Sequence, residues 1–186
     1  MQPTHTLTRL TVIGKLIIAS SFFLSLAVQA QQCGQTAPLI NERLSYMKDV
    51  AGYKAENHLP IEDHIQEEKV INSAMAQAES LGLNGESIKP LMVAQINAAK
   101  AIQYRYRADW LSQPEPGWQP KPLDNVRANI GELSTKILKQ IAEELKTCKP
   151  AEMGDKAHFI NTIRQHNLTS ADVEAIFSTF NQVKLK

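Results

Sequence analysis

Apolar residues recur at steps of three and four along most of this chain, and no other feature restricts its fold as strongly. Between residues 37 and 57, Ile40, Leu44 and Ala51 fall on one face of a helix. Comparable runs begin near Ile61 or Asp63 and end at residue 81, and then cover residues 87–111, 124–145, 155–166 and 169–183. No stretch shows the alternation of a half-buried strand. The sequence therefore predicts an all-α fold, with a single domain of about six helices.

Several residues indicate where these helices begin and end. The Leu-Pro pair at residues 59–60 ends the first helix, because proline disfavours helical geometry in the residue before it. Ser87 and Asp124 are the expected N-caps of the third and fourth helices. Thr169, with Asp172 three residues later, predicts a capping box at the last helix.

The first thirty residues have the three-part composition of a secretory signal. Arg9 and Lys15 supply a basic start, residues 16–28 form an uncharged apolar run, and small residues precede a cleavage point at Ala30. The apolar run is shorter than the roughly 20 residues that span a bilayer, so a retained membrane anchor is the less favoured alternative. We expect residues 1–30 to be removed, leaving a periplasmic or secreted protein that starts near Gln31 and is not held at the membrane.

The chain contains two cysteines, Cys33 and Cys148. In an oxidising compartment they allow one intramolecular pairing. The sequence therefore predicts a Cys33–Cys148 disulfide, which ties the start of the mature chain to the end of a later helix. Two free thiols, or an intermolecular pairing, are the alternative.

Four prolines between residues 114 and 122 exclude a regular helix there and predict a stiff connector over residues 114–123. The connector separates an N-terminal helical core, residues 31–113, from C-terminal helices, residues 124–186, that belong to the same domain.

Charge and motifs exclude several classes of function. The chain has 20 Lys and Arg against 19 Asp and Glu, whereas nucleic-acid-binding proteins usually have a basic excess. It has no glycine-rich phosphate loop, no Cys-x-x-Cys pair, no His-x-x-x-His pair and no serine nucleophile elbow. We therefore expect no nucleic-acid partner and no metal site.

Two cations lie where a helix should face its neighbours. Arg43 and Lys54 are eleven residues apart, close to three helical turns, so they share a face with Ile40 and Leu44. Cations beside an apolar face need anionic partners, unless their long side chains extend to solvent. Spacing alone leaves both interpretations open.

Four further polar residues stand out. Asp63 and Glu67 form an acidic pair one turn apart, which a substrate hydroxyl or a cation could stabilise, although a solvated helix start has the same pattern. Gln103 lies in a strongly apolar helix, so its amide needs a partner, either a ligand or a neighbouring helix. Arg127 lies in the first turn of a helix, where the dipole disfavours a cation; an ordinary surface arginine is the alternative.

Together these residues resemble the core of the all-helical chorismate mutases. The resemblance rests on residues 39–54 (LINERLSYMKDVAGYK), on residues 59–67, and on an Arg–Lys–Asp–Glu spacing of eleven, nine and four residues. It covers roughly residues 39–127. The signal segment, Tyr104 with Asp109 and Trp110, and the additional C-terminal helices are similar to the secreted subclass of that family.

The resemblance implies a role for each residue. Arg43 would bind a substrate carboxylate, and Lys54 would contact a carboxylate and the ether oxygen. Asp63 and Glu67 would hold the region of the ring hydroxyl. Gln103 would donate a hydrogen bond to the ether oxygen.

Arg127 would reach the site from a later helix of the same chain, so that one chain builds one complete site. Two positions depart from the family. Gln66 stands where relatives often have arginine, and Ala99 stands where many have serine or threonine. Both lie near the ring carboxylate in relatives, and Lys69 or Lys100 could compensate.

The resemblance implies an isomerase of the shikimate pathway and aromatic amino acid biosynthesis, which converts chorismate, a dianion, into prephenate without a cofactor. Secreted relatives are often dimers, so a homodimer is compatible with it. The alternative function is a non-enzymatic helical periplasmic adaptor or chaperone, which would bind partners through an amphipathic face.

Overall fold

A computed structural model describes residues 33–149 and 155–186 of the chain. These residues belong to one compact unit, Gln31–Lys186, and the predicted all-α fold is confirmed. The predicted signal segment and its cleavage site lie outside the described residues. The described helices are α2 (Thr36–Ser45), α3 (Met47–Glu56), α4 (His64–Ser80), α5 (Gly85–Ser112), α6 (Leu123–Thr147), α8 (Lys156–Thr162) and α9 (Ser170–Phe180).

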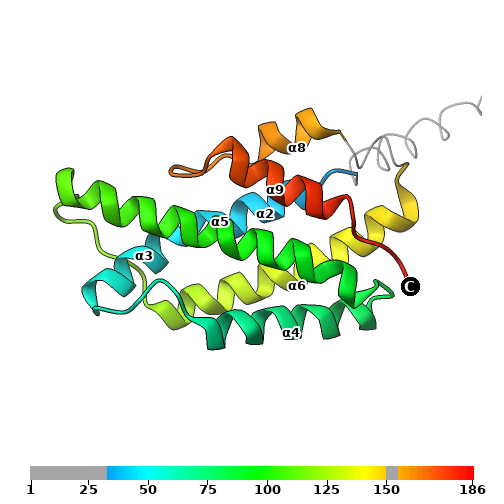
Figure 1. The fold of residues 1–186 in the computed structure, drawn as a ribbon, viewed down its shortest axis with the longest axis horizontal. Coiled ribbons are helices and arrows are strands. Elements are labelled where there is room, and N and C mark those ends of the chain that lie inside the picture. Colours follow the sequence, from blue (N-terminus) through cyan, green and yellow to red (C-terminus); the bar gives the residue numbers. More distant parts are fainter. Residues whose placement is uncertain (1–32, 150–154) are drawn as a thin grey trace, which may run out of the picture. The chain divides into compact units, whose positions relative to one another are not determined.

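Two long helices organise the bundle. α5 packs against α3, α4 and α9, while α6 packs against α2, α3 and α4. Figure 1 shows α8 and α9 together on one side of α5, and α4 and α6 on the other. Ile40, Ile88, Ile102, Ile141 and Ile176, each at most 1% exposed, belong to the core between them. Helices from before and after the proline-rich connector therefore share one hydrophobic core. None of the described helices combines the length and apolar character needed to cross a bilayer.

The first expected helix is two helices. α2 ends at Ser45 and α3 begins at Met47, so the prediction of one continuous helix over residues 37–57 was wrong at Tyr46. The hydroxyl of Ser45 donates a 2.7 Å hydrogen bond to the backbone oxygen of Glu42. Such a bond competes with the helical backbone pattern and bends the helix. The interruption is confined to one residue.

Two helix starts also differ from prediction. α5 begins two residues before Ser87, and its N-cap is Asn84, whose side chain accepts a hydrogen bond from the Ser87 N–H. Asparagine caps as well as serine does, so the helix starts at the first of the two caps. α6 begins one residue before Asp124 and has Pro122 at its N-cap position. Asp124 instead lies in the first turn, where its charge suits the helix dipole.

The end of the chain is held in place at both sides of α9. The predicted capping box is confirmed, since Thr169 and Asp172 each accept a hydrogen bond from the backbone N–H of the other. After α9, Leu185 forms an isolated β-bridge with Leu83, in the turn between α4 and α5. The C-terminal segment therefore closes over the start of α5.

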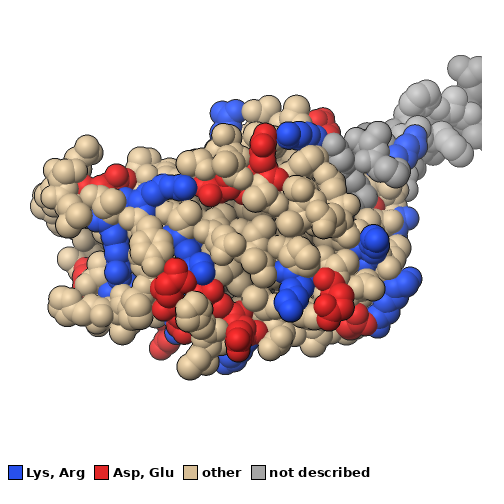
Figure 2. Space-filling view, viewed as in Figure 1, with Lys and Arg blue, Asp and Glu red and all other residues tan. Residues whose placement is uncertain are grey.

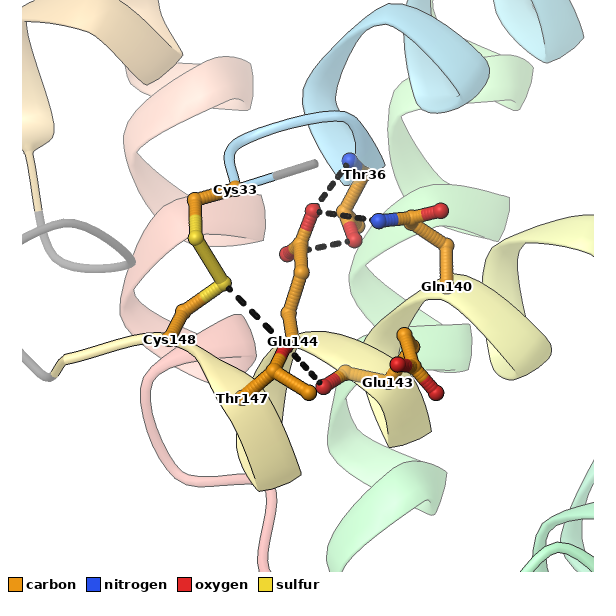
Figure 3. The surroundings of a disulfide bond; sticks show 7 residues. All are labelled: Cys33, Thr36, Gln140, Glu143, Glu144, Thr147 and Cys148. Carbon is orange, nitrogen blue, oxygen red and sulfur yellow. Dashed lines mark hydrogen bonds between the residues drawn. A yellow bond between two sulfur atoms is a disulfide. The ribbon is translucent and has the colours of Figure 1, made fainter. Parts of the chain in front are cut away.

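The predicted disulfide is present. Cys33 and Cys148 are bonded, with their Cα atoms 5.9 Å apart, and they connect the residues before α2 to the end of α6. Figure 3 shows this bond beside the side chain of Glu144, which lies one turn earlier on α6. Two neighbouring interactions therefore join the same two helices.

The carboxylate of Glu144 is the second of these interactions. It is 1% exposed and accepts hydrogen bonds from the backbone N–H and the hydroxyl of Thr36, at 3.0 and 2.9 Å, and from Gln140 Nε2 at 3.0 Å. Gln35, the N-cap residue of α2, makes no side-chain capping bond. Glu144 thus supplies, from another helix, the acceptor and the negative charge that a helix start needs.

Replacing both Cys33 and Cys148 with serine should lower the free energy of unfolding by about 2–5 kcal/mol, because the bond constrains an unfolded loop across a separation of 115 residues. Thermal unfolding followed by circular dichroism, with and without a reductant, measures the effect. The reductant should lower the Tm of the parent protein toward that of the double variant and leave the variant unchanged. Equal Tm values for the two proteins without reductant would show that the bond does not stabilise the fold.

Candidate functional site

A cavity of about 270 Å³ lies inside the bundle. Its wall is formed by residues of α2, α3, α4, α5 and α6, together with the segment before α4. The structure brings together all six residues that the sequence singled out for the site. They are Arg43, Lys54, Asp63, Glu67, Gln103 and Arg127.

Positive charge prevails in this cavity. Five cationic side chains and two carboxylates line it, and a cavity with such a lining attracts anions. The face drawn in Figure 2 has no matching bias, because acidic and basic side chains are interspersed over it. The excess of positive charge in the cavity is therefore not a feature of that face as a whole.

Arg43, on α2, does not extend to solvent. It is 4% exposed, its Nε donates a 3.2 Å hydrogen bond to Ser134 Oγ on α6, and its Nη1 is buried without a partner. Burial lowers the pKa of the guanidinium to about 10, so it stays charged at neutral pH. A buried guanidinium with an unused N–H is suited to bind a carboxylate.

Lys54, on α3, is the second buried cation. It is 6% exposed, and its Nζ donates a 2.8 Å hydrogen bond to the backbone oxygen of Ile61. Burial lowers its pKa, and Asp63 partly opposes that effect, whereas the charge of Arg127 adds to it. An ammonium has three donors, so Lys54 keeps donors for a ligand.

Asp63 and Arg127 meet at the start of α4. Asp63 is the N-cap of that helix, and its Oδ1 accepts a 3.2 Å hydrogen bond from the Gln66 N–H. Its Oδ2 accepts a 3.0 Å bond from Arg127 Nη2, on α6. The ion pair explains why an arginine can lie in the first part of α6. Its charge is compensated by Asp63, which comes from the other side of the proline-rich connector in the sequence.

Glu67 belongs to a network around Lys100. The Nζ of Lys100 donates to Glu67 Oε2 at 3.1 Å and to Glu62 Oε2 at 2.9 Å. Ligand atoms of Glu62, His64 and Glu67 lie within 4.8 Å of one another, which is close enough for a metal ion. A cation there would have to displace the ammonium of Lys100 from both carboxylates. The arrangement favours an ion-pair network over a metal site.

Gln103, on α5, is 5% exposed. Its Nε2 donates a 3.1 Å hydrogen bond to the backbone oxygen of Ala99 and lies 3.8 Å from Met47 Sδ. Its Oε1 is buried without a partner. The only hydrogen-bond partner of this amide on another helix is therefore the weak acceptor Met47 Sδ, among the described residues. The Oε1 of the amide accepts no hydrogen bond.

Sequence reasoning missed Ser134, which holds Arg43. Ser134 lies seven residues after Arg127, two turns along α6, so the same spacing argument could have found it. The two positions that depart from the family, Gln66 and Ala99, both line the cavity.

Comparison with known proteins identifies the family. Residues 35–104 match the chorismate mutase type II family. The chain is 98% identical over 186 residues to a secreted chorismate mutase of Yersinia pestis, with both chains covered completely. It is 35% identical over 171 residues to a monofunctional chorismate mutase of Enterobacter agglomerans, which covers 92% of this chain and 93% of that one. The chain belongs to the type II chorismate mutase family.

Solved structures agree in fold. The crystal structure of the secreted chorismate mutase from Yersinia pestis superposes with a TM-score of 0.81 and covers 83% of this chain and 99% of that chain, at 98% identity. A chorismate mutase from Burkholderia phymatum, 21% identical, superposes with a TM-score of 0.69 over 82% of this chain and 98% of its own. This second likeness shows that the fold persists when most of the sequence has changed.

Replacing Arg43 with methionine should raise the free energy of unfolding of the ligand-free protein by about 1–4 kcal/mol, because it removes a buried charge that has no carboxylate in contact. Chemical denaturation measures the change. Arg164→Met, at an exposed position, is the matched control and should change the unfolding free energy little. A variant less stable than the parent would show that Arg43 contributes to folding and not only to the site.

Proposed function

We propose that this chain converts chorismate into prephenate in the cavity between α2, α3, α4, α5 and α6. The observation that carries the proposal is the convergence of all six family positions on one cavity, in a chain 98% identical to a secreted chorismate mutase. A non-enzymatic adaptor would not need two buried cations that line one cavity.

The reaction suits a site of this kind. Chorismate rearranges in one concerted step, in which the ether C–O bond breaks while a new C–C bond forms within the same molecule. No proton transfer, nucleophile or metal ion is needed. The protein has to hold the side chain of the substrate over its ring and to stabilise the charge that develops on the ether oxygen.

Arginines are suited to the two carboxylates of the substrate. Arg43 offers an unused, buried Nη1, and guanidinium groups bind carboxylates through two parallel hydrogen bonds. Arg127 is half-buried and paired with Asp63, which holds it at the cavity wall until a substrate carboxylate can share it. In the proposed arrangement, Arg43 of α2 and Arg127 of α6 each bind one of the two substrate carboxylates.

Lys54 and Gln103 are the proposed donors to the ether oxygen. Lys54 is charged and buried, so its hydrogen bond acts where little water screens it. The Nε2 of Gln103 carries two N–H groups. One donates to the backbone oxygen of Ala99, and the other, which has only the weak acceptor Met47 Sδ nearby, is the proposed donor to the ether oxygen.

We also propose that the chain acts outside the cytoplasm after removal of residues 1–30. The relative from Yersinia pestis is named a secreted protein, and the disulfide between Cys33 and Cys148 suits an oxidising compartment. The expected homodimer stays a prediction.

Lys54→Ala should reduce kcat by about 10²–10³-fold, the effect of removing one donor that stabilises transition-state charge. Loss of chorismate absorbance, measured with the oxidised chain from Gln31 onward, gives the rate. Lys89→Ala, at an exposed lysine of α5 outside the cavity, is the control and should keep the parent rate. A folded, oxidised parent protein without activity would refute the function, whereas full activity in Lys54→Ala would refute only the role of Lys54.

The activity should stay level from mildly acidic to neutral pH, because an amide such as Gln103 donates at any pH. It should fall at alkaline pH as Lys54 loses its proton, and at a pH below 10.5, because burial lowers the pKa of Lys54. The pH profile of kcat/KM, which reports the free enzyme, measures both limits. In Gln103→Glu the donor must be protonated, so the activity of that variant should fall between about pH 5 and 7. A parent profile with the same acid-side loss would contradict the role of Gln103.

A further inference from the structure

Part of the cavity wall is exposed to solvent. Of the residues that line it, three are exposed, and the others are buried or half-buried. The exposed three are Lys69 and Ser73 on α4 and Gly131 on α6. Because α4 and α6 pack directly against each other, these residues mark an opening between the two helices.

Gly131 lines the cavity at this opening. It lies in the interior of α6, where glycine destabilises a helix relative to alanine. A Cβ atom added there would meet no atom within 4 Å, so close packing does not require glycine at this position. The position therefore has room for a larger side chain beside the cavity that Gly131 lines.

Lys69 differs from the other cations that line the cavity. Lys54 and Arg43 donate to an uncharged oxygen each, while Lys100 and Arg127 are paired with carboxylates. Among the described residues, no hydrogen bond or ion pair is observed for Lys69. Its ammonium is carried on a flexible four-carbon stem at the opening, where it can reach an anion either outside the cavity or just inside it.

We propose that the substrate enters the cavity between α4 and α6, and that Lys69 binds the substrate carboxylate that remains nearest to this opening. The proposal rests on the function proposed above and adds an entrance and a binding residue to it. The two buried cations, Arg43 and Lys54, are 4% and 6% exposed and cannot contact an anion before it enters. Lys69, which is exposed at the opening, can contact the anion before it enters and can keep that contact as the substrate settles.

Lys69→Gln tests the binding role. The substitution keeps most of the side-chain length and removes the charge. We expect KM for chorismate to rise roughly tenfold, which is the effect of losing one charge-assisted hydrogen bond at the weak end of its range. We expect kcat to stay within about twofold of the parent value, because Lys69 does not contact the breaking bond. The ionic-strength dependence of kcat/KM should also become weaker.

Lys89→Gln is the matched control, because Lys89 is an exposed lysine of α5 that does not line the cavity. It should leave KM, kcat and the salt dependence unchanged, and Lys69→Arg should retain most of the parent affinity. A KM in Lys69→Gln equal to that of the control, or a loss confined to kcat, would overturn the role of Lys69. Both results require an active parent enzyme, so they are distinguishable from failure of the proposed function itself, in which the parent is inactive.

Gly131→Leu tests the position of the entrance. A leucine side chain should extend into the open space and reduce kcat/KM by at least about tenfold, while Gly131→Ala should keep the parent rate and raise the Tm through its better helix propensity. Thermal unfolding shows whether the leucine variant is folded. Unchanged kcat/KM in folded Gly131→Leu would overturn an entrance at this point. If the leucine variant does not fold, Lys69→Gln still decides the proposal.

Discussion

Two positive charges inside a helical bundle impose the main constraint on this structure. Arg43 and Lys54 are almost fully buried, and each donates a hydrogen bond to an uncharged oxygen instead of a carboxylate. Removing a charge from water is costly unless an opposite charge or several hydrogen bonds compensate for it. The two buried cations therefore form an arrangement that an anionic ligand can stabilise.

Two buried charges at the contact between α2 and α6 differ in how well they are satisfied. Glu144 of α6, which lies at the start of α2, is as deeply buried as Arg43, but its carboxylate accepts three hydrogen bonds from Thr36 and Gln140. Seven residues after Thr36, Arg43 leaves one N–H without a partner. The disulfide and the Glu144 interaction fasten α2 to α6, and this anchoring, with the apolar core, offsets the burial of an uncompensated cation. The free energy stored at the site is thus balanced by contacts outside it.

Ion pairs at the edge of the cavity decide which cationic side chains have a fixed position before a ligand binds and which can move. Arg127 is held by Asp63, and Lys100 by two carboxylates, so both have defined positions before a ligand arrives. Preset donors lose little entropy when a substrate binds, which is how electrostatic catalysis works in a site without general acids or bases. Lys69 has the opposite character, a mobile charge at the opening, and that character suits capture more than catalysis.

Local spacing in the sequence was sufficient for the helical regions, but it left the roles of Arg43 and Lys54 open. Repeated steps of three and four identified each helical region, because burial of one face requires that period. Two cysteines in a chain with an expected secretory signal predicted the disulfide. The family resemblance selected the six cavity residues. The interruption at Tyr46 and the cap at Asn84 escaped prediction, since short-range hydrogen bonds of Ser45 and Asn84 decide between nearly equal backbone arrangements.

The helical period and the charge of each side chain were therefore determined by the sequence itself, because both depend on residues within a few turns of one another. Only the tertiary structure decided which groups those charges meet. Arg43 and Ser134 are 91 residues apart, Asp63 and Arg127 are 64 apart, and Thr36 and Glu144 are 108 apart. Spacing along the chain does not predict such pairs, because the packing of α2 and α4 against α6 brings their members together. The same packing decides where the cavity opens between α4 and α6.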